Sequence, residues 1–236
     1  MAFPGDPTSI TIDGKKFKLG ELKDEIETIR SMFMFDRKEL DTKTVYAFRN
    51  EKSLKSWAKD NSLDQWYKQL RSGKRPAKGS YTPEQEAELK KALKTEVDWQ
   101  TKRFATTLAQ NGIESSDSDA IIRLIENPDP RRGPILGSAT IWEHDDHRGH
   151  YRYLPNYRVY CSLASIGYDR RISSLINYGG TIRLYNLLNG SLSCPDPDDL
   201  TNFNHDFREL VFSGSRRIFK LSPFGFNDVA RSAETV

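Results

Sequence analysis

The sequence predicts a mostly helical α+β N-terminal domain over residues 1–133, followed by an all-β Greek-key sandwich over residues 138–236. Apolar residues recur at helical spacing in the first part and alternate with a period of two in the second. The first part has 16 Lys and 9 Arg against 22 acidic residues, whereas residues 134–236 have 1 Lys and 10 Arg against 11 acidic residues. Three prolines and a glycine within 127–134 mark a linker. We therefore expect two units that fold independently, joined at 127–137.

The N-terminal part begins with a hairpin signal, because alternating apolar residues flank Asp13-Gly14 within residues 9–19. Residues 44–48 have the composition of a short strand. The predicted helices share apolar residues at helical spacing, and most also start at a capping residue. They cover about 20–34, a segment after Asn50, a segment after Ser62, Pro83 to about Gln110, and about 117–126.

The N-terminal part shows no motif for chemistry. It has no histidine, phosphate loop, dinucleotide fingerprint or metal-ligand spacing of cysteines. A basic stretch at 72–80 follows Trp66 and Tyr67, but the formal net charge of the whole chain is only +3, so we interpret it as a solvated loop. We expect no nucleic-acid partner, and a protein partner, if there is one, to bind the helical domain.

The cysteine content and the hydropathy of the sequence bear on disulfide bonding, membrane insertion and secretion. Cys161 and Cys194 are too few for a disulfide framework, so free thiols are the default expectation. No apolar run reaches membrane-spanning length, and the first 14 residues lack the pattern of a secretion leader. We expect a soluble protein that is cytoplasmic by default, or a mature protein whose leader has been removed.

Short strands separated by turn signals fill the C-terminal part, as expected of a sandwich built from two Greek keys. The predicted strands cover 139–142, 150–154, 157–160, 172–177, 181–185, 207–212, 217–221 and the tail from 229.

Two motifs in this part resemble those of the βγ-crystallin family. Trp142 is followed after six residues by Gly149, as in the folded first hairpin of that family's Greek key. The family's second motif is Asn/Asp-Asn/Asp-x-x-Ser/Thr-Ser. It is matched by 169–174 except at the second position and by 227–232 except at the fifth. The resemblance covers about 138–236 and implies a βγ-crystallin-like sandwich.

The second Greek key, which contains the signature at 227–232, departs further from the family. Tyr185 lacks the glycine expected at Leu192, and an insertion of roughly 15 residues that includes Cys194 enlarges the first hairpin. Whether this hairpin keeps its folded shape stays open.

The resemblance implies two calcium sites, each built from both signatures with hard oxygen ligands. If the family's ligand positions are transferred to this sequence, Ser173 and Asn227 share one site. At the other site Asp169 faces Arg231, whose guanidinium repels calcium. We therefore expect weak binding of about one ion. The candidate metal residues are Asp169, Arg170, Ser173, Asn227 and Asp228. The alternative is that both signatures only stabilise turns.

Arg231 stands where the family has a metal ligand. An unpaired cation at a former metal position is costly, so Arg231 should form an ion pair with Asp169.

Three histidines, His144, His147 and His150, lie among acidic residues, but a hairpin points their side chains in different directions. We therefore interpret this stretch as a surface loop, and the isolated His205 as structural. No catalytic set of residues can be assembled from spacing.

We accordingly expect a non-enzymatic structural or calcium-responsive binding protein whose helical domain binds a protein partner. One alternative is a proteinase inhibitor of crystallin-like fold that uses the insertion at 191–204. The other is an enzyme or toxin with its active part in 1–133.

Overall fold

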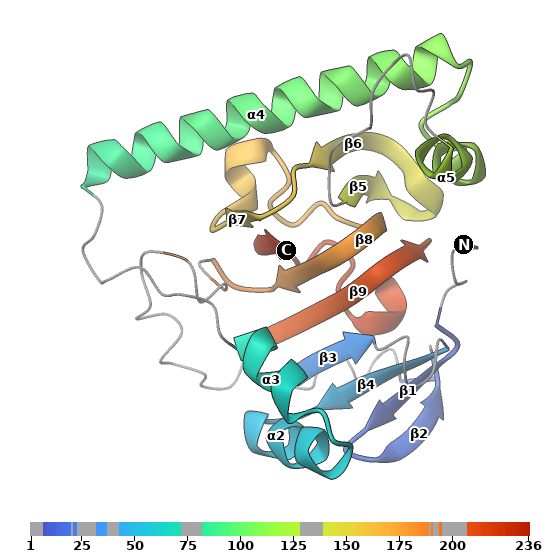
Figure 1. The fold of residues 1–236 in the computed structure, drawn as a ribbon, viewed down its shortest axis with the longest axis vertical. Helices are drawn as coiled ribbons and strands as arrows, with labels where there is room; N and C mark the ends of the chain where they lie inside the picture. Colours follow the sequence, from blue (N-terminus) through green and yellow to red (C-terminus); the bar gives the residue numbers. More distant parts are fainter. Residues whose placement is uncertain are drawn as a thin grey trace.

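The computed structural model describes residues 7–19, 21–22, 32–36, 43–71, 82–127, 139–188, 190, 194 and 207–236 (Figure 1). The strands are β1 (Ser9–Ile12), β2 (Lys15–Lys18), β3 (Met32–Asp36), β4 (Thr44–Phe48), β5 (Ala139–His144), β6 (Arg148–Leu154), β7 (Arg158–Tyr160), β8 (Ser174–Tyr185), β9 (Arg208–Ile218) and β10 (Ser232–Thr235). The α-helices are α2 (Glu51–Asp60), α3 (Asp64–Arg71), α4 (Pro83–Gln110) and α5 (Ser118–Glu126), and the 3-10 helices are η1 (Asp145–His147), η2 (Leu163–Ile166) and η3 (Ser222–Phe224).

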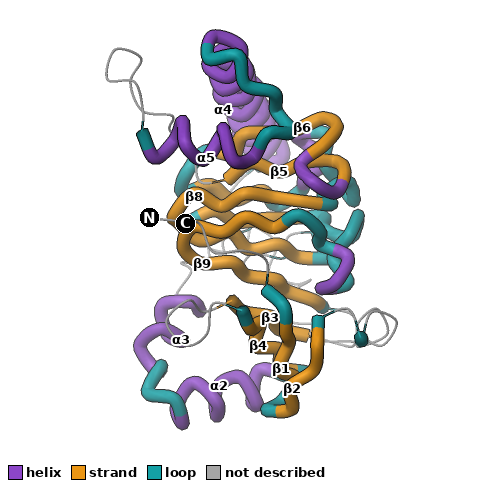
Figure 2. The backbone as a smooth tube through the Cα atoms, turned by 90° about the vertical axis from the view of Figure 1, so that its right-hand side faces the viewer, coloured by secondary structure: helices purple, strands orange, loops and turns teal. Residues whose placement is uncertain are grey.

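The described strands form one continuous sheet with the order β2-β1-β4-β3-β9-β8-β10-β7, and β5 joins β8 to β6. Strand β8 organises the C-terminal part, because its first half pairs with β5 and its second half with β10. The N-terminal strands extend this sheet at one end, where β3 runs parallel to β9 with Phe33 opposite Glu209 (Figure 2). The two parts of the chain therefore do not form separate sheets.

The N-terminal part contains strands as well as helices. The expected helix over about 20–34 is wrong at its end, because Phe33 lies in β3, and residues 23–31 lie outside the described residues. The hairpin at Asp13-Gly14 is confirmed, and both residues have the positive φ that its tight turn requires. The expected start of α4 is confirmed as well, because Thr82 and Gln85 form a reciprocal capping box.

Helix α4 covers the β5–β6 hairpin at the other end of the molecule (Figure 1). The Phe104 ring stacks on Tyr153 at a centroid distance of 4.7 Å. The Thr101 hydroxyl accepts from the backbone N–H of Tyr153 at 3.0 Å. The indole N–H of Trp142 donates to the carbonyl of Ser115 at 3.2 Å. These contacts join the two predicted units in one apolar cluster, which conflicts with independent folding. The linker boundary itself stays a prediction, because residues 128–138 lie outside the described residues.

The two faces of the sheet bury different clusters. Leu184 on β8 packs into the larger cluster together with Ile10 from β1, whereas the next residue, Tyr185, packs against Phe33 and its aromatic neighbours on the opposite face. Charges are buried on this second face. Arg183 and Glu234 lie 3.5 Å apart with side chains that are each 10% exposed. Breaking this pair would therefore leave a charge in an apolar environment.

Cys161 and Cys194 form a disulfide with their Cα atoms 5.7 Å apart. The expectation of free thiols is therefore wrong for this structure. Spacing alone could not reveal the bond, because it joins the end of β7 to the inserted segment across 33 residues of sequence. None of the described helices is long and apolar enough to cross a membrane.

Candidate metal centre

The two signature stretches adopt the same backbone conformation. Each follows a 3-10 helix that ends at a left-handed glycine, with φ of 77° at Gly167 and 64° at Gly225. The second signature position is also left-handed in both copies, with φ of 54° at Arg170 and 55° at Asp228. Asp and Asn tolerate this conformation better than arginine does, so Arg170 is the less favourable residue for its position.

Backbone hydrogen bonds cross between the two signatures. The N–H of Arg170 donates to the carbonyl of Ala230 at 2.9 Å, and the N–H of Asp228 donates to the carbonyl of Ile172 at 3.1 Å. This reciprocal exchange places each signature beside the other, as the resemblance implied. Residues far apart in sequence are thereby brought into two equivalent sites.

The last serine of each signature holds the first hairpin of its own motif. The Ser174 hydroxyl donates to the carbonyl of His144 at 2.6 Å and accepts from the N–H of His147 at 3.1 Å. The Ser232 hydroxyl likewise donates to the carbonyl of Leu187 at 2.7 Å and accepts from the N–H of Gly190 at 3.0 Å. The second hairpin therefore keeps these contacts despite its insertion.

A glycine is also required in the second hairpin, at position 190, which corresponds to His147 of the first hairpin because each backbone N–H donates to the last serine of its signature. A Cβ atom at Gly190 would lie 2.4 Å from the Cβ of Tyr185, closer than any real contact. In the first hairpin, a Cβ atom at Gly149 would lie 2.7 Å from the ring of His144. The family's spacing motif does not mark this position, and Leu192, where that motif expects a glycine, lies outside the described residues.

The first candidate site gathers four kinds of oxygen-bearing groups. The Ser173 hydroxyl donates to the carbonyl of Glu143 at 2.7 Å and lies 3.2 Å from Asp228 Oδ1. The Asn227 amide donates to Asp228 Oδ2 at 3.0 Å, so its own oxygen remains available as a ligand. Ser173 is buried, whereas Asn227 and Asp228 are exposed. A hydroxyl, a carbonyl, a carboxylate and an amide are ligands that suit Ca²⁺.

The second candidate site is occupied by an ion pair. Arg231 stands at the position equivalent to Ser173, and its Nε lies 3.4 Å from Asp169 Oδ1. The equivalence is visible in the backbone, because the N–H of Ser173 donates to the carbonyl of Trp142 and the N–H of Arg231 donates to the carbonyl of Tyr185. The predicted pairing of Asp169 with Arg231 is therefore confirmed. Both side chains are about one-third exposed, at 29% and 32%.

A second arginine lies beside the first site. The Arg171 guanidinium pairs with Glu143, and this hydrogen bond lowers the pKa of the Glu143 carboxyl. The Glu143 carboxylate is therefore engaged with Arg171 while its backbone carbonyl accepts from Ser173. Glu143 was not among the sequence candidates, because its backbone oxygen carries no signal in the sequence.

The histidines near this site do not form a metal cluster. His147 is buried between Trp142 and Phe219, with ring centroids 4.9 and 4.8 Å away, whereas His144 and His150 are exposed. The surface-loop interpretation is therefore wrong for His147. Within the described residues, no group of three or more His, Cys, Asp or Glu side chains could hold a metal ion. His205 lies outside the described residues.

His147 is held in its neutral form. Its Nε2 lies 3.3 Å from the carbonyl of Leu175 and 3.2 Å from that of Ile218, which identifies Nε2 as the protonated ring nitrogen. Burial lowers the pKa of His147 to about 4, and the nearby Arg217 adds to this effect. The two carbonyls oppose the shift but do not outweigh burial.

Comparisons with solved structures find a similarity to βγ-crystallin domains over about 42% of this chain. A beta gamma crystallin from Ciona intestinalis is 17% identical and matches 42% of this chain and 100% of its own, with a TM-score of 0.31. A betagamma-crystallin from an archaeon is 16% identical over 43% of this chain and 99% of its own, with a TM-score of 0.30. Spherulin 3A from Physarum polycephalum is 17% identical over 42% of this chain and 81% of its own, with a TM-score of 0.29.

These similarities concern the fold alone, and they leave the remaining residues unassigned. No protein-family model and no curated protein matches the chain.

Proposed function

We propose that this chain is a non-enzymatic, calcium-responsive binding protein with a structural role, which takes up one Ca²⁺ weakly between its two Greek-key motifs. The observation that supports it is the position of Ser173. Its hydroxyl lies within hydrogen-bond distance of both the Glu143 carbonyl and the Asp228 carboxylate. Rotation of this hydroxyl would turn its proton away from these two oxygens, so that its lone pair and both oxygens would face one hard cation.

Binding of one ion rather than two follows from Arg231. At the second site its guanidinium already neutralises Asp169. A cation there would have to displace a charged side chain and leave it near a like charge, which is unfavourable.

Weak affinity follows from the ligand count. Ca²⁺ takes six to eight oxygen ligands, and its affinity rises with the number of carboxylates. The first site offers one carboxylate, from Asp228, and the exposure of Asn227 and Asp228 leaves the remaining positions to water. We expect a dissociation constant on the order of 10⁻⁴ M, in the range of low-affinity extracellular modules.

Isothermal titration with CaCl₂, against MgCl₂ as the competing ion, tests the proposal. Asp228→Asn should weaken calcium binding tenfold or more, because it removes the one carboxylate while keeping a side chain suited to positive φ. Ser173→Ala should act in the same direction. Asp169→Asn is the matched control at the second site and should leave the affinity unchanged. Equal affinity in all of these variants, or two tight sites in the unmodified chain, would rule the proposal out.

A further inference from the structure

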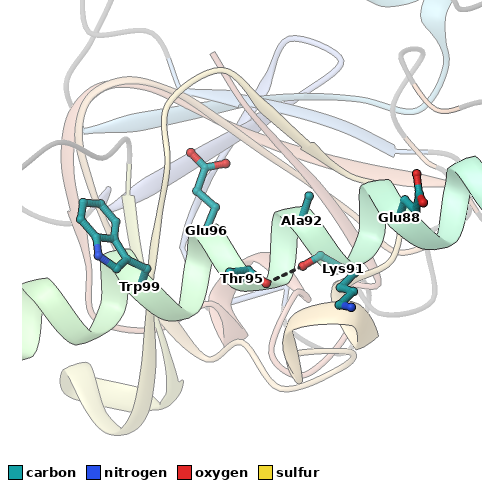
Figure 3. Close-up of a pocket in the computed structure, with 6 residues that line it drawn as sticks. All are labelled: Glu88, Lys91, Ala92, Thr95, Glu96 and Trp99. Atoms are coloured by element: carbon teal, nitrogen blue, oxygen red, sulfur yellow. Dashed lines mark hydrogen bonds between the residues drawn. The ribbon is translucent and has the colours of Figure 1, made fainter.

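Helix α4 presents an exposed outer face that the rest of the described chain does not cover. Trp99 and Leu89 are 56% and 51% exposed, among the most exposed large apolar side chains of the described residues. A shallow hollow lies on this face (Figure 3). It is lined by Glu88, Lys91, Ala92, Thr95, Glu96 and Trp99.

The arrangement of these residues follows from helical spacing. Glu88, Ala92, Thr95 and Trp99 recur at intervals of four, three and four, so they form one stripe along the helix. The buried residues of α4, such as Phe104, lie on the opposite side against the β5–β6 hairpin. The stripe therefore points away from the core.

The stripe is complementary to itself in the antiparallel direction. A two-fold axis between residues 95 and 96 would place Trp99 of one copy over Ala92 of the other, a large side chain against a small one. The same axis would place Glu88 opposite Arg103, whose guanidinium already lies 5.6 Å from the ring of Trp99. A parallel arrangement would instead bring Glu88 against Glu88 and Lys91 against Lys91, which is repulsive.

We propose that this face of α4 binds a second copy of the chain, as an antiparallel helix pair centred between residues 95 and 96. The contact covers about four helical turns, less area than a standard stable interface, so the dimer is weak and concentration-dependent. It does not depend on calcium, because no residue of the candidate metal centre lies on α4.

Sedimentation velocity over a range of protein concentrations, in buffer with EDTA and low salt, tests the association. The weight-average mass should rise with concentration from that of one chain toward that of two. Trp99→Ala should abolish the rise. Glu88→Arg and Arg103→Glu should each weaken association tenfold or more, and the double variant should restore it because the opposite charges are then exchanged.

Cross-linking supplies a second measurement that does not depend on the folding of these variants. Thr95 and Thr106 lie on the same exposed stripe, and each hydroxyl donates to the carbonyl four residues earlier at 2.9 Å, so they are a matched pair. At 1.5 Å of rise per residue, Thr106 lies about 16 Å from the proposed axis, so the two copies of this residue are about 30 Å apart.

Under mild oxidation, Thr95→Cys should give a covalent dimer on a non-reducing gel, whereas Thr106→Cys should not. A chain that remains monomeric at every concentration overturns the proposal and would assign the face to a different partner. Cross-linking of both cysteine variants to the same extent, or unchanged association of Trp99→Ala, also overturns it.

Discussion

Acidification should destabilise this protein through one buried side chain, His147. In the folded chain its pKa is lowered to about 4 by burial, whereas in the unfolded chain it returns to its ordinary value of 6.5. Between these two values the unfolded chain binds a proton that the folded chain does not. The contribution of His147 to stability is therefore fully present above pH 6.5 and is lost as the pH falls toward about 4.

The size of this effect follows from the shift. One pKa unit corresponds to about 1.4 kcal/mol, so lowering the pH from 7 to 4.5 should remove about 2–3 kcal/mol of unfolding free energy through His147 alone. The groups that face the ring are the carbonyls of Leu175 and Ile218, the guanidinium of Arg217 and the carboxylate of Asp146. All four groups remain in every variant used for comparison.

Urea denaturation at several pH values between 7 and 4.5 measures this dependence. His147→Gln keeps an N–H donor for the two carbonyls but cannot titrate, so its loss of stability over this range should be about 2–3 kcal/mol smaller than that of the unmodified chain. His150→Gln is the control, because His150 is exposed, and it should behave like the unmodified chain. The same pH dependence in His147→Gln and in the unmodified chain would refute the reasoning.

Three further predictions concern single contacts. Arg231→Ser should raise calcium affinity in a titration and cost about 0–1 kcal/mol of metal-free stability, because its pair with Asp169 is partly exposed. Reduction of Cys161–Cys194, or replacement of both by serine, should lower the unfolding free energy in urea by about 3–4 kcal/mol, because the bond closes 33 residues. Arg183→Met should cost about 3–5 kcal/mol in the same assay, because it leaves the buried carboxylate of Glu234 without this cation; a loss below 1 kcal/mol would contradict this.

The repeated signatures could be predicted because they impose local geometry. Gly167 and Gly225 end equivalent turns, and the copies lie in register, so the pairing of Asp169 with Arg231 followed from the sequence. Prediction failed where pairing is distant in sequence. Strand β3 (Met32–Asp36) has apolar residues that suit a helix as well as a strand, and its parallel partner β9 lies more than 170 residues later.

Strand breaks were another source of error. Gly179 and Gly180 predicted a turn between two strands, but β8 (Ser174–Tyr185) continues through them. The pairing with β9 shifts between Tyr178 and Thr181, where Gly179 has a φ of 148°. Glycine thus accommodates a bulge inside a long strand rather than ending it.

The contacts that join the two signatures in the metal-free protein limit how much stability bound calcium can add. The signatures are already joined by the bonds from Arg170 to Ala230 and from Asp228 to Ile172, and Arg231 supplies a fixed cation at the second site. At 1 mM Ca²⁺ and a dissociation constant of about 10⁻⁴ M, one bound ion adds about 1.4 kcal/mol of stability. The disulfide is expected to contribute more than twice as much. The proposed ion would therefore adjust a fold that forms without it, and its signal should be sought in local changes around Ser173 rather than in folding itself.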